Sequence, residues 1–287
     1  MNRLPRSHLT IATFSHAGLA GKKNEDRFAV ACYAGASGKA VFFGALSDGI
    51  GGHRAGEVAA EIAVNDIVRV VSRSDGTDPL AIMEAGIQSA SQAIASRSAS
   101  HKDEAGMGAT CACLWIEGDR LYGAYVGDSR IYLIREEKIQ RLTVDHTWVQ
   151  EAIDSGSLAP EQARHHPNAH VLRRHLGSGE LPEVDLRLHF RGRESDEQAR
   201  SNQGARLSPG DIVLMCTDGL TDMIWDDEIL RLITTRNALT SAAEDLVARA
   251  NERGGHDNIT VVLVGVPRLT PAASRKKKGF LQELLRR

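Results

Sequence analysis

The sequence contains no long apolar segment. No run of about 18 uninterrupted apolar residues occurs, whereas a membrane-spanning helix needs about 20. The first residues, Met-Asn-Arg-Leu-Pro-Arg, are not followed by the apolar region of a signal peptide, so we expect a cytoplasmic protein. Aromatic residues make up only 5% of the chain, and no basic stripe with interleaved aromatics occurs in its body. We therefore expect no nucleic-acid-binding surface.

Cysteine is also scarce. The four cysteines form no Cys-x-x-Cys pair and lie in apolar runs typical of strands, so we interpret them as reduced core residues: Cys32, Cys111, Cys113 and Cys216. With 287 residues, 42% of them hydrophobic and 25% charged, the chain is long enough to bury a substantial core. The net charge of −2 is unevenly spread, because residues 275–287 hold six basic residues and one acidic residue.

Hydrophobic periodicity predicts a mixture of strands and helices. Short apolar runs bounded by turn residues predict strands at 9–16, 28–34, 41–46, 110–116, 120–126, 130–134, 138–142, 211–216 and 258–266. Helical spacing predicts helices at 57–71, from Asp78-Pro79 onward, 147–155, 160–166, 226–235 and 240–253. Short connections predict an antiparallel meander between residues 110 and 143, and composition predicts a flexible loop at 191–204.

The stretch from Ala45 to Glu57 combines an acidic residue with several glycines. Asp48 falls at the predicted end of a strand, and Gly49, Gly51 and Gly52 leave the following backbone open to close approach by a ligand. A carboxylate beside a bare carbonyl suits a divalent cation such as Mg²⁺ or Mn²⁺. The alternative is a glycine-rich turn with a capping aspartate.

Three further aspartates occur in similar settings. Asp128, Asp218 and Asp257 each lie at a predicted strand end near glycine, and Glu25-Asp26 precedes another strand. The ends of antiparallel strands gather at one rim of a sandwich, so these carboxylates are expected to converge. Carboxylates a few ångströms apart repel each other unless protons or cations neutralise them. A centre with two metal ions is the interpretation that makes such a cluster tolerable.

Six motifs together resemble a known family. In order along the chain they are Asn24-Glu25-Asp26, Asp48-Gly49-Ile50-Gly51-Gly52 with Gly56-Glu57, Gly108-Ala109-Thr110, Val126-Gly127-Asp128-Ser129-Arg130, Asp218-Gly219-Leu220-Thr221-Asp222 and Gly255-His256-Asp257-Asn258. The chain resembles the bacterial form of the metal-dependent serine/threonine protein phosphatases of type 2C (PPM family). The resemblance implies an α+β fold, an antiparallel β-sandwich flanked by antiparallel helices on both faces. It places a catalytic domain at 1–266 with a flap at about 145–205, and leaves 267–287 as a basic linker and amphipathic tail.

The resemblance also implies roles for individual residues. Asp48, Asp218 and Asp257 would act in catalysis by holding two Mn²⁺ or Mg²⁺ ions that activate water, with the Gly49 carbonyl as a further ligand. Asp26 is expected to bind metal directly or through water, and Asp128 to bind a third, weaker ion. Glu25, Asp222 and Asn258 would support these ligands, Asn258 by orienting Asp257.

Several features qualify the resemblance. The arginine that many members place five residues before the aspartate equivalent to Asp26 is Gly21 here, so Lys22 or Lys23 is the candidate phosphate-binding residue. The histidine that eukaryotic members often carry after Asp-Gly is Ile50, as is common in bacterial members. We interpret the histidines His165, His166 and His170 as part of a polar flap segment and not as a metal cluster.

The implied function is hydrolysis of phosphoserine and phosphothreonine in proteins, reversing a bacterial serine/threonine kinase. No cysteine has an arginine six positions later and no Asp-x-Asp follows a strand, so the phosphatase chemistries with a cysteine or aspartate nucleophile are excluded. The alternatives are a catalytically weak member that binds phosphoproteins and a phosphatase of a sigma-factor antagonist. We expect a monomer, with a tail that contacts an anionic membrane surface or a partner, or is a solvated terminus.

Overall fold

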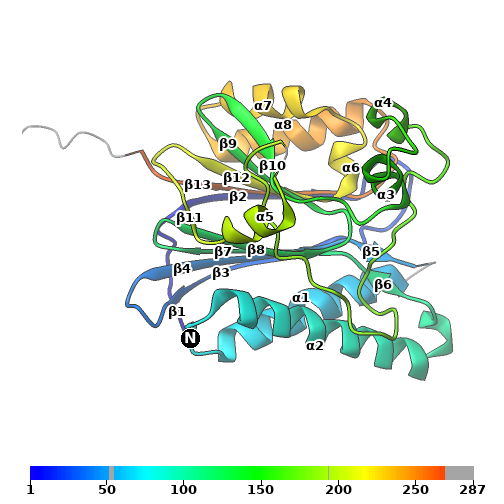
Figure 1. Cartoon of the computed structure of the whole chain (residues 1–287), viewed down its shortest axis with the longest axis horizontal. Coiled ribbons are helices and arrows are strands. Elements are labelled where there is room, and N and C mark those ends of the chain that lie inside the picture. Colours follow the sequence, from blue (N-terminus) through cyan, green and yellow to red (C-terminus); the bar gives the residue numbers. More distant parts are fainter. Residues whose placement is uncertain (52–54, 193, 269–287) are drawn as a thin grey trace, which may run out of the picture.

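The computed structural model describes residues 1–51, 55–192 and 194–268. The predicted amphipathic tail and part of the predicted glycine loop, residues 52–54, lie outside the described residues. Two antiparallel sheets pack face to face, and helices cover the outer face of each (Figure 1). The predicted α+β sandwich with helices on both faces is therefore confirmed.

The first sheet has six strands. Their spatial order is β1 (Asn2–Arg3), β3 (Arg27–Ala34), β4 (Ala40–Ser47), β7 (Cys111–Glu117), β8 (Arg120–Val126) and β11 (Ala205–Arg206). The second sheet has the order β10 (Lys138–Arg141), β9 (Arg130–Arg135), β12 (Ile212–Cys216), β13 (Ile259–Gly265) and β2 (Thr10–His16). A short third pair joins β5 (Gly49–Ile50) to β6 (Gly108–Ala109).

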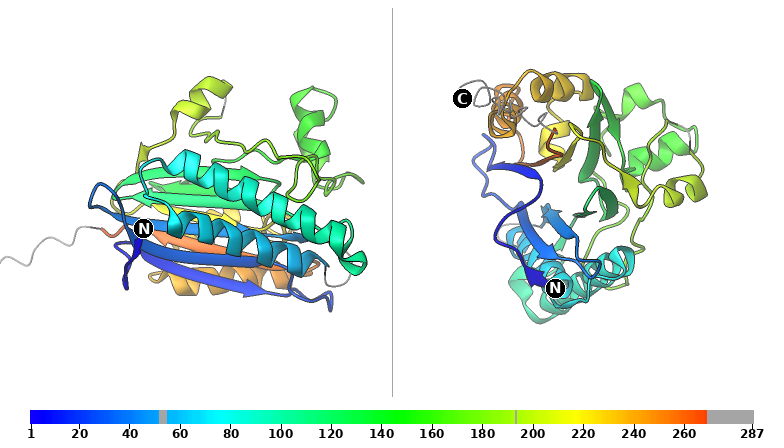
Figure 2. Two further views of the ribbon diagram at one scale, coloured as in Figure 1. Left: turned by 90° about the horizontal axis from the view of Figure 1, so that it is seen from below. Right: turned by 90° about the vertical axis from the view of Figure 1, so that its left-hand side faces the viewer.

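The helices divide between the two sheets. The first sheet is covered by α1 (Ala55–Arg73) and α2 (Pro79–Ser100), and the second by α6 (Asp218–Thr221), α7 (Asp226–Thr234) and α8 (Leu239–Glu252) (Figure 1). A short 3-10 turn, η1 (Lys102–Glu104), follows α2. The segment 145–205 adds α3 (Trp148–Asp154), α4 (Pro160–Ala163) and α5 (Asp196–Ser201), which project to one side of the sandwich (Figure 2).

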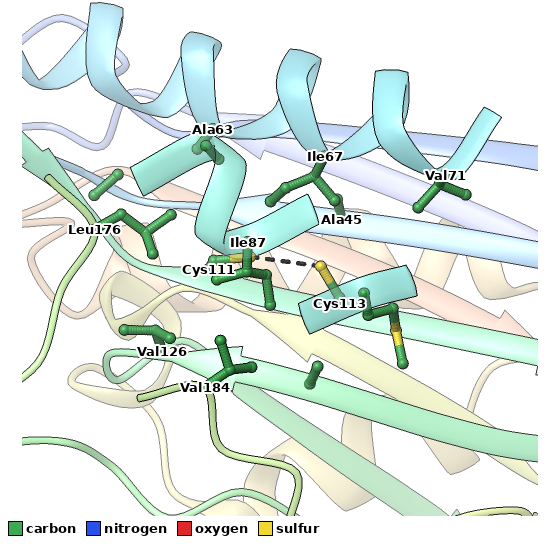
Figure 3. Close-up of a cluster of buried hydrophobic side chains, with 14 of the residues drawn as sticks. Ala45, Ala63, Ile67, Val71, Ile87, Cys111, Cys113, Val126, Leu176 and Val184 are labelled. Carbon is green, nitrogen blue, oxygen red and sulfur yellow. Dashed lines mark hydrogen bonds between the residues drawn. The ribbon is translucent and has the colours of Figure 1, made fainter. Parts of the chain in front are cut away.

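The central strands are apolar on both faces because each face meets another layer. In β4, Val41, Phe43 and Ala45 pack towards α1 and α2, whereas Phe42 and Leu46 pack between the two sheets. This arrangement explains the unbroken apolar run in the sequence. Figure 3 shows the layer beneath the helices, where Ile67 of α1 and Ile87 of α2 are fully buried. Cys111 and Cys113 lie in the same layer, and all four cysteines are buried and reduced, as predicted.

The start of α2 shows how local sequence fixes an element. The carboxylate of Asp78 accepts hydrogen bonds from the backbone N–H groups of Leu80 and Ala81, both 3.1 Å long. Pro79 occupies the first helical position, where no intrahelical N–H bond is needed. The predicted cap is therefore confirmed.

The predicted meander from 110 to 143 is confirmed for its two antiparallel hairpins and wrong for the step between them. The two hairpins within it are present, since β7 pairs with β8 and β9 pairs with β10. However, β8 belongs to the first sheet and β9 to the second. Residues 127–129 therefore carry the chain from one sheet to the other, and the short connection conceals this change from a reading of the sequence.

The predicted flexible loop at 191–204 is wrong for residues 196–201, which form α5. Ser195 accepts a hydrogen bond from the Gln198 backbone N–H, and the Gln198 side chain accepts one from the Ser195 N–H. These reciprocal bonds form a capping box. Ala199 is fully buried, and the Gln203 side chain bonds to the backbone of β8 at Gly123.

Within the described ranges, no helix has the length and apolarity needed to cross a bilayer.

Candidate metal centre

Five aspartates from distant parts of the sequence meet at one end of the sandwich. Each lies next to a strand end, as predicted: Asp26 before β3, Asp48 between β4 and β5, Asp128 between β8 and β9, Asp218 after β12 and Asp257 before β13. Burial raises the pKa of Asp48 well above its usual range. The charges of Asp26, Asp218, Asp128 and Asp257 raise this pKa further, so the four other carboxylates all lie near enough to act on Asp48. The predicted convergence of acidic residues is therefore confirmed by the geometry.

Two of these carboxylates have a fully buried oxygen without a hydrogen-bond partner among the described residues. Asp26 is only 3% exposed, and its Oδ2 accepts a hydrogen bond of 2.9 Å from the Thr217 hydroxyl. Its Oδ1, and the Oδ1 of Asp218, are buried without a hydrogen-bond donor among the described residues. Burial, followed by the charges of Asp218 and Asp257, raises the pKa of Asp26 to about 7. Unpaired buried carboxylate oxygens are costly unless a proton or a cation satisfies them.

The backbone around Asp48 is fixed on both sides. The Asp48 N–H donates to the Thr110 hydroxyl at 3.0 Å, and the Thr110 N–H donates to the Asp48 carbonyl at 2.9 Å. The hydroxyl groups of Thr110 and Ser129 are 2.8 Å apart, which links this turn to the loop of Asp128. A Cβ on Gly49 would lie 2.1 Å from the carbonyl oxygen of Gly56. Only glycine therefore fits at position 49.

Asn258 holds a different segment from the one predicted. Its side-chain amide donates to the carbonyls of Ala17 and Lys23 and accepts from the Glu25 N–H at 2.7 Å. Only its backbone N–H contacts Asp257, at 2.9 Å from Oδ1. The Asn258 side chain thus orients the loop that leads to Glu25 and Asp26. Burial and the charge of Asp257 raise the pKa of Glu25.

His170 joins the acidic residues from the flap. Its Nδ1 lies 3.4 Å from Oδ2 of Asp222 and 3.8 Å from Oδ2 of Asp218. Ligand atoms of these three residues lie within 4.8 Å of one another. The interaction with Asp218, together with the charges of Asp222 and Asp128, raises the pKa of His170 to about 9. Burial and the charge of Asp218 raise that of Asp222 to about 6.

The sequence did not identify His170, because its approach to Asp218 depends on how the flap packs. Among the described residues, His170 is the only histidine in the group that could hold a metal. His166 instead stacks on Trp148, with ring centroids 4.8 Å apart. The proximity of His170 to Asp218 and Asp222 makes it a candidate ligand that the sequence analysis did not name.

The two candidate phosphate-binding lysines differ in position. Lys22 Nζ lies 3.7 Å from Oδ2 of Asp257, and both side chains are more than half exposed. Lys23 is exposed, and its backbone carbonyl accepts the bond from Asn258. Lys22 is therefore beside the acidic cluster, whereas the contacts of Lys23 involve its backbone.

The carboxylates of the cluster form a set of hard donors, because Asp26 and Asp128 are buried, Asp48 is partly buried, and Asp26 and Asp218 each have an unpaired oxygen. Oxygen ligands of this kind are the preferred ligands of Mg²⁺ and also suit Mn²⁺. Burial raises the pKa of Asp128, as it does for Asp48, and the charges of Asp218 and Asp145 raise the pKa of Asp128 further. The negative charges of these carboxylates therefore need to be neutralised. The residues present therefore fit divalent cations.

Comparisons with known proteins agree with this arrangement. The family model described as Protein phosphatase 2C matches residues 15–263. Serine/threonine protein phosphatase PstP of Mycobacterium tuberculosis is 34% identical over 259 residues, which are 90% of this chain and 45% of that protein. The chain thus spans about half the length of this relative. Protein phosphatase PhpP of Streptococcus pneumoniae is 36% identical over 226 residues, covering 77% of this chain and 84% of that protein.

Solved structures show the same fold. The crystal structure of the Mycobacterium tuberculosis phosphatase PstP/Ppp has a TM-score of 0.74 and 32% identity, and the match covers 91% of this chain and 99% of that one. The structure of the S. agalactiae serine/threonine phosphatase has a TM-score of 0.78 and 31% identity, with 90% and 99% covered. The family model extends over all five aspartates and most of both sheets, and so the chain belongs to the protein phosphatase 2C family.

Proposed function

We propose that this chain hydrolyses phosphoserine and phosphothreonine in proteins and that the reaction depends on Mn²⁺ or Mg²⁺. The observation that carries the proposal is the convergence of five aspartates with unpaired, buried oxygens on Asp26 and Asp218. Both PstP and PhpP are named as protein phosphatases, and one PstP catalytic domain of 32% identity is a complex with two manganese ions.

In this proposal Asp48, the Gly49 carbonyl, Asp218 and Asp257 hold two ions, with Asp26 beside them. Asp128 and Asp222 would hold a third ion, and His170, which lies beside Asp218 and Asp222, would offer a nitrogen ligand once it has released its proton. Bound ions would supply Lewis acidity, which lowers the pKa of water and neutralises phosphate oxygens.

The protein's own groups prepare this chemistry. Asp26, Asp48 and Asp128 have raised pKa values, so they must release protons before they bind cations. The Thr217 hydroxyl holds one oxygen of Asp26 and leaves the other available. Lys22 brings an ammonium group next to Asp257, where it would attract the phosphate of a substrate. All four cysteines are buried, which excludes a thiol nucleophile.

Other parts of the proposal rest on the sequence. Residues 1–266 would form the catalytic domain, with 145–205 as its flap and 267–287 as a basic linker and tail that contacts a partner or a membrane surface. A serine/threonine kinase as the opposing enzyme, a monomeric state and a cytoplasmic location belong to the same proposal.

The decisive experiment measures metal content and hydrolysis together. With Mn²⁺ present, the wild type is expected to release phosphate from p-nitrophenyl phosphate and from a phosphothreonine peptide. Asp218→Asn is expected to lose both the metal and the activity, whereas Asp103→Asn, an exposed aspartate far along the sequence from the cluster, is expected to keep both. An inactive wild type that still binds the peptide would favour the phosphoprotein-binding alternative. A preference for a phosphorylated anti-sigma antagonist over a phosphorylated kinase would favour the sigma-factor alternative.

A further inference from the structure

A cavity of about 590 Å³ opens beside the acidic cluster, between the flap and the second sheet's helices. Asp128 and Asp218 form one end of this cavity. Its walls come from α3, α4 and the turn between α6 and α7, and include Val149 and Ile153 on the flap side. The cavity therefore extends from the proposed reaction centre along the flap.

Arg164 and Trp225 form a rigid pair in the wall of the cavity. The guanidinium carbon of Arg164 lies 3.4 Å from the centroid of the Trp225 ring, which is the geometry of a cation–π contact. Nη2 of Arg164 donates to the carbonyls of Thr221 at 2.5 Å and Ile224 at 3.3 Å. The guanidinium is thus fixed in place, while Trp225 remains 54% exposed.

Arg164 differs from the other arginines of the cavity because it has no carboxylate partner. Arg130 and Arg141 both pair with Asp145, at 2.7 and 3.3 Å. No carboxylate oxygen in the described part of the chain lies within 4.0 Å of the Arg164 guanidinium, and only its Nη2 has a hydrogen-bond acceptor there. Burial lowers the pKa of Arg164, and the charges of Asp222 and Asp226 oppose this from nearby without touching the guanidinium. A partly desolvated cation with no carboxylate in direct contact is a site for an anion.

We infer that this cavity binds the residues that flank the phosphorylated residue of a substrate protein, and that Arg164 binds an acidic side chain among them. This inference rests on the proposed phosphatase function and names the substrate class. The apolar side of the cavity, with Val149, Ile153 and the face of Trp225, accommodates the stems of the flanking side chains.

The aspartates that line the cavity oppose Arg164, because their negative charge disfavours an acidic side chain. Asp222 faces His170 at 3.4 Å, and Asp226 accepts a hydrogen bond from the Tyr132 hydroxyl at 3.1 Å. Asp227 also lines the cavity. If these carboxylates governed recognition, the cavity would prefer a basic flanking residue, so the sign of the preference tests the inference directly.

The test uses phosphothreonine peptides that are identical except for glutamate or lysine, placed in turn at each of three positions on either side of the phosphothreonine. For the wild type with Mn²⁺, kcat/KM is expected to be about tenfold higher for the glutamate peptide at one or more of these positions, as expected for one charge-assisted hydrogen bond. Arg164→Glu is expected to reverse the ratio and Arg164→Ala to bring it near one. Because each ratio is taken within one variant, a general loss of activity cancels.

Arg173→Ala is the matched control. Arg173 is another flap arginine, but it is exposed, pairs with Glu151 at 2.9 Å and does not line the cavity. This variant is expected to keep the wild-type ratio. A wild-type ratio of one or a preference for lysine at every position, or a glutamate preference that survives Arg164→Ala, would overturn the inference.

Failure of the proposed function would look different. In that case the wild type would hydrolyse neither p-nitrophenyl phosphate nor any peptide, and the same peptides would be compared by calorimetric titration. Tighter binding of the glutamate peptide by the wild type but not by Arg164→Ala would still support the cavity as an anion-recognition site. Equal affinities would overturn it.

Discussion

His146 and Gly127 exchange two hydrogen bonds where the chain passes from β8 in the first sheet to β9 in the second. The Gly127 N–H donates to Nδ1 of His146, and the His146 N–H donates to the Gly127 carbonyl, each at 3.0 Å. Because Nδ1 accepts, Nε2 carries the proton of a neutral ring and donates to Oδ2 of Asp185 at 3.2 Å. The ring also stacks on Tyr125, with centroids 5.2 Å apart. His146 thus fixes the loop that presents Asp128.

Replacing His146 by alanine is expected to destabilise the protein and to weaken the proposed binding of a third ion by Asp128. The Gly127 N–H would lose its acceptor in a buried place, which costs about 1–3 kcal/mol. Urea unfolding of the metal-free protein measures the first effect, and calorimetric titration with Mn²⁺ measures the second. His101→Ala, at an exposed histidine that ends α2, is the control and should change neither. Unchanged stability in His146→Ala would show that the loop does not depend on this ring.

The raised pKa of Asp26 predicts that, as the pH rises, the stability of the metal-free protein falls and the stabilisation by metal grows. The folded-state pKa is about 7, whereas an unfolded aspartate has a pKa of about 3.9. Between these values the folded protein binds more protons than the unfolded chain, so the stability of the metal-free protein should fall as the pH rises from 5 to 8. Asp48 and Asp128 act in the same direction because their pKa values are also raised.

Mn²⁺ competes with these protons, and its stabilising effect should therefore grow over the same range. Thermal unfolding in EDTA and in excess Mn²⁺, at several pH values, measures both trends. In Asp26→Asn the metal-free trend should become shallower. A metal-free melting temperature that rises from pH 5 to pH 8 would contradict the prediction.

The sequence predicts well those features that depend on local chemistry or on burial between the layers of the fold. Asp78 and Pro79 mark the start of α2 by their own chemistry, and the apolar run of β4 follows from burial on both faces. Asp48-Gly49 is recognisable because the turn needs both a carboxylate and a residue without a side chain.

What the sequence does not predict depends on packing between distant segments. The short connection at residues 127–129 is the length of a hairpin, yet it joins two sheets. His170 lies in an irregular segment, and its distance from Asp218 is set by how the flap docks. Whether Arg164 contacts a carboxylate likewise depends on its neighbours in space. The spacing of residues in the sequence does not reveal these neighbours.

Removing the His170 side chain is expected to lower the affinity for one Mn²⁺ ion by about 10- to 100-fold, the usual effect of losing a residue that supports a metal site. Mg²⁺ should be affected less, because an imidazole nitrogen suits Mn²⁺ better than Mg²⁺. Calorimetric titration of His170→Ala with each metal measures the difference. His166→Ala removes a histidine from the same flap that stacks on Trp148, and it should leave both titrations unchanged. Equal losses for the two metals would argue against a nitrogen ligand.

Replacement by alanine is expected to change stability in opposite directions at Gly86 and Gly49. Gly86 lies inside α2, and a Cβ there would lie 3.5 Å from the nearest atoms of Ile67, which is ordinary van der Waals contact. Gly86→Ala should therefore raise the free energy of unfolding by about 0.5–1 kcal/mol, the gain in helix propensity. At Gly49 the added Cβ would lie 2.1 Å from the Gly56 carbonyl oxygen, so Gly49→Ala should displace the turn that carries Asp48 and lower both stability and Mn²⁺ affinity. Urea unfolding and Mn²⁺ titration of both variants check the contrast, and a stable, metal-binding Gly49→Ala would show that this backbone contact does not define the site.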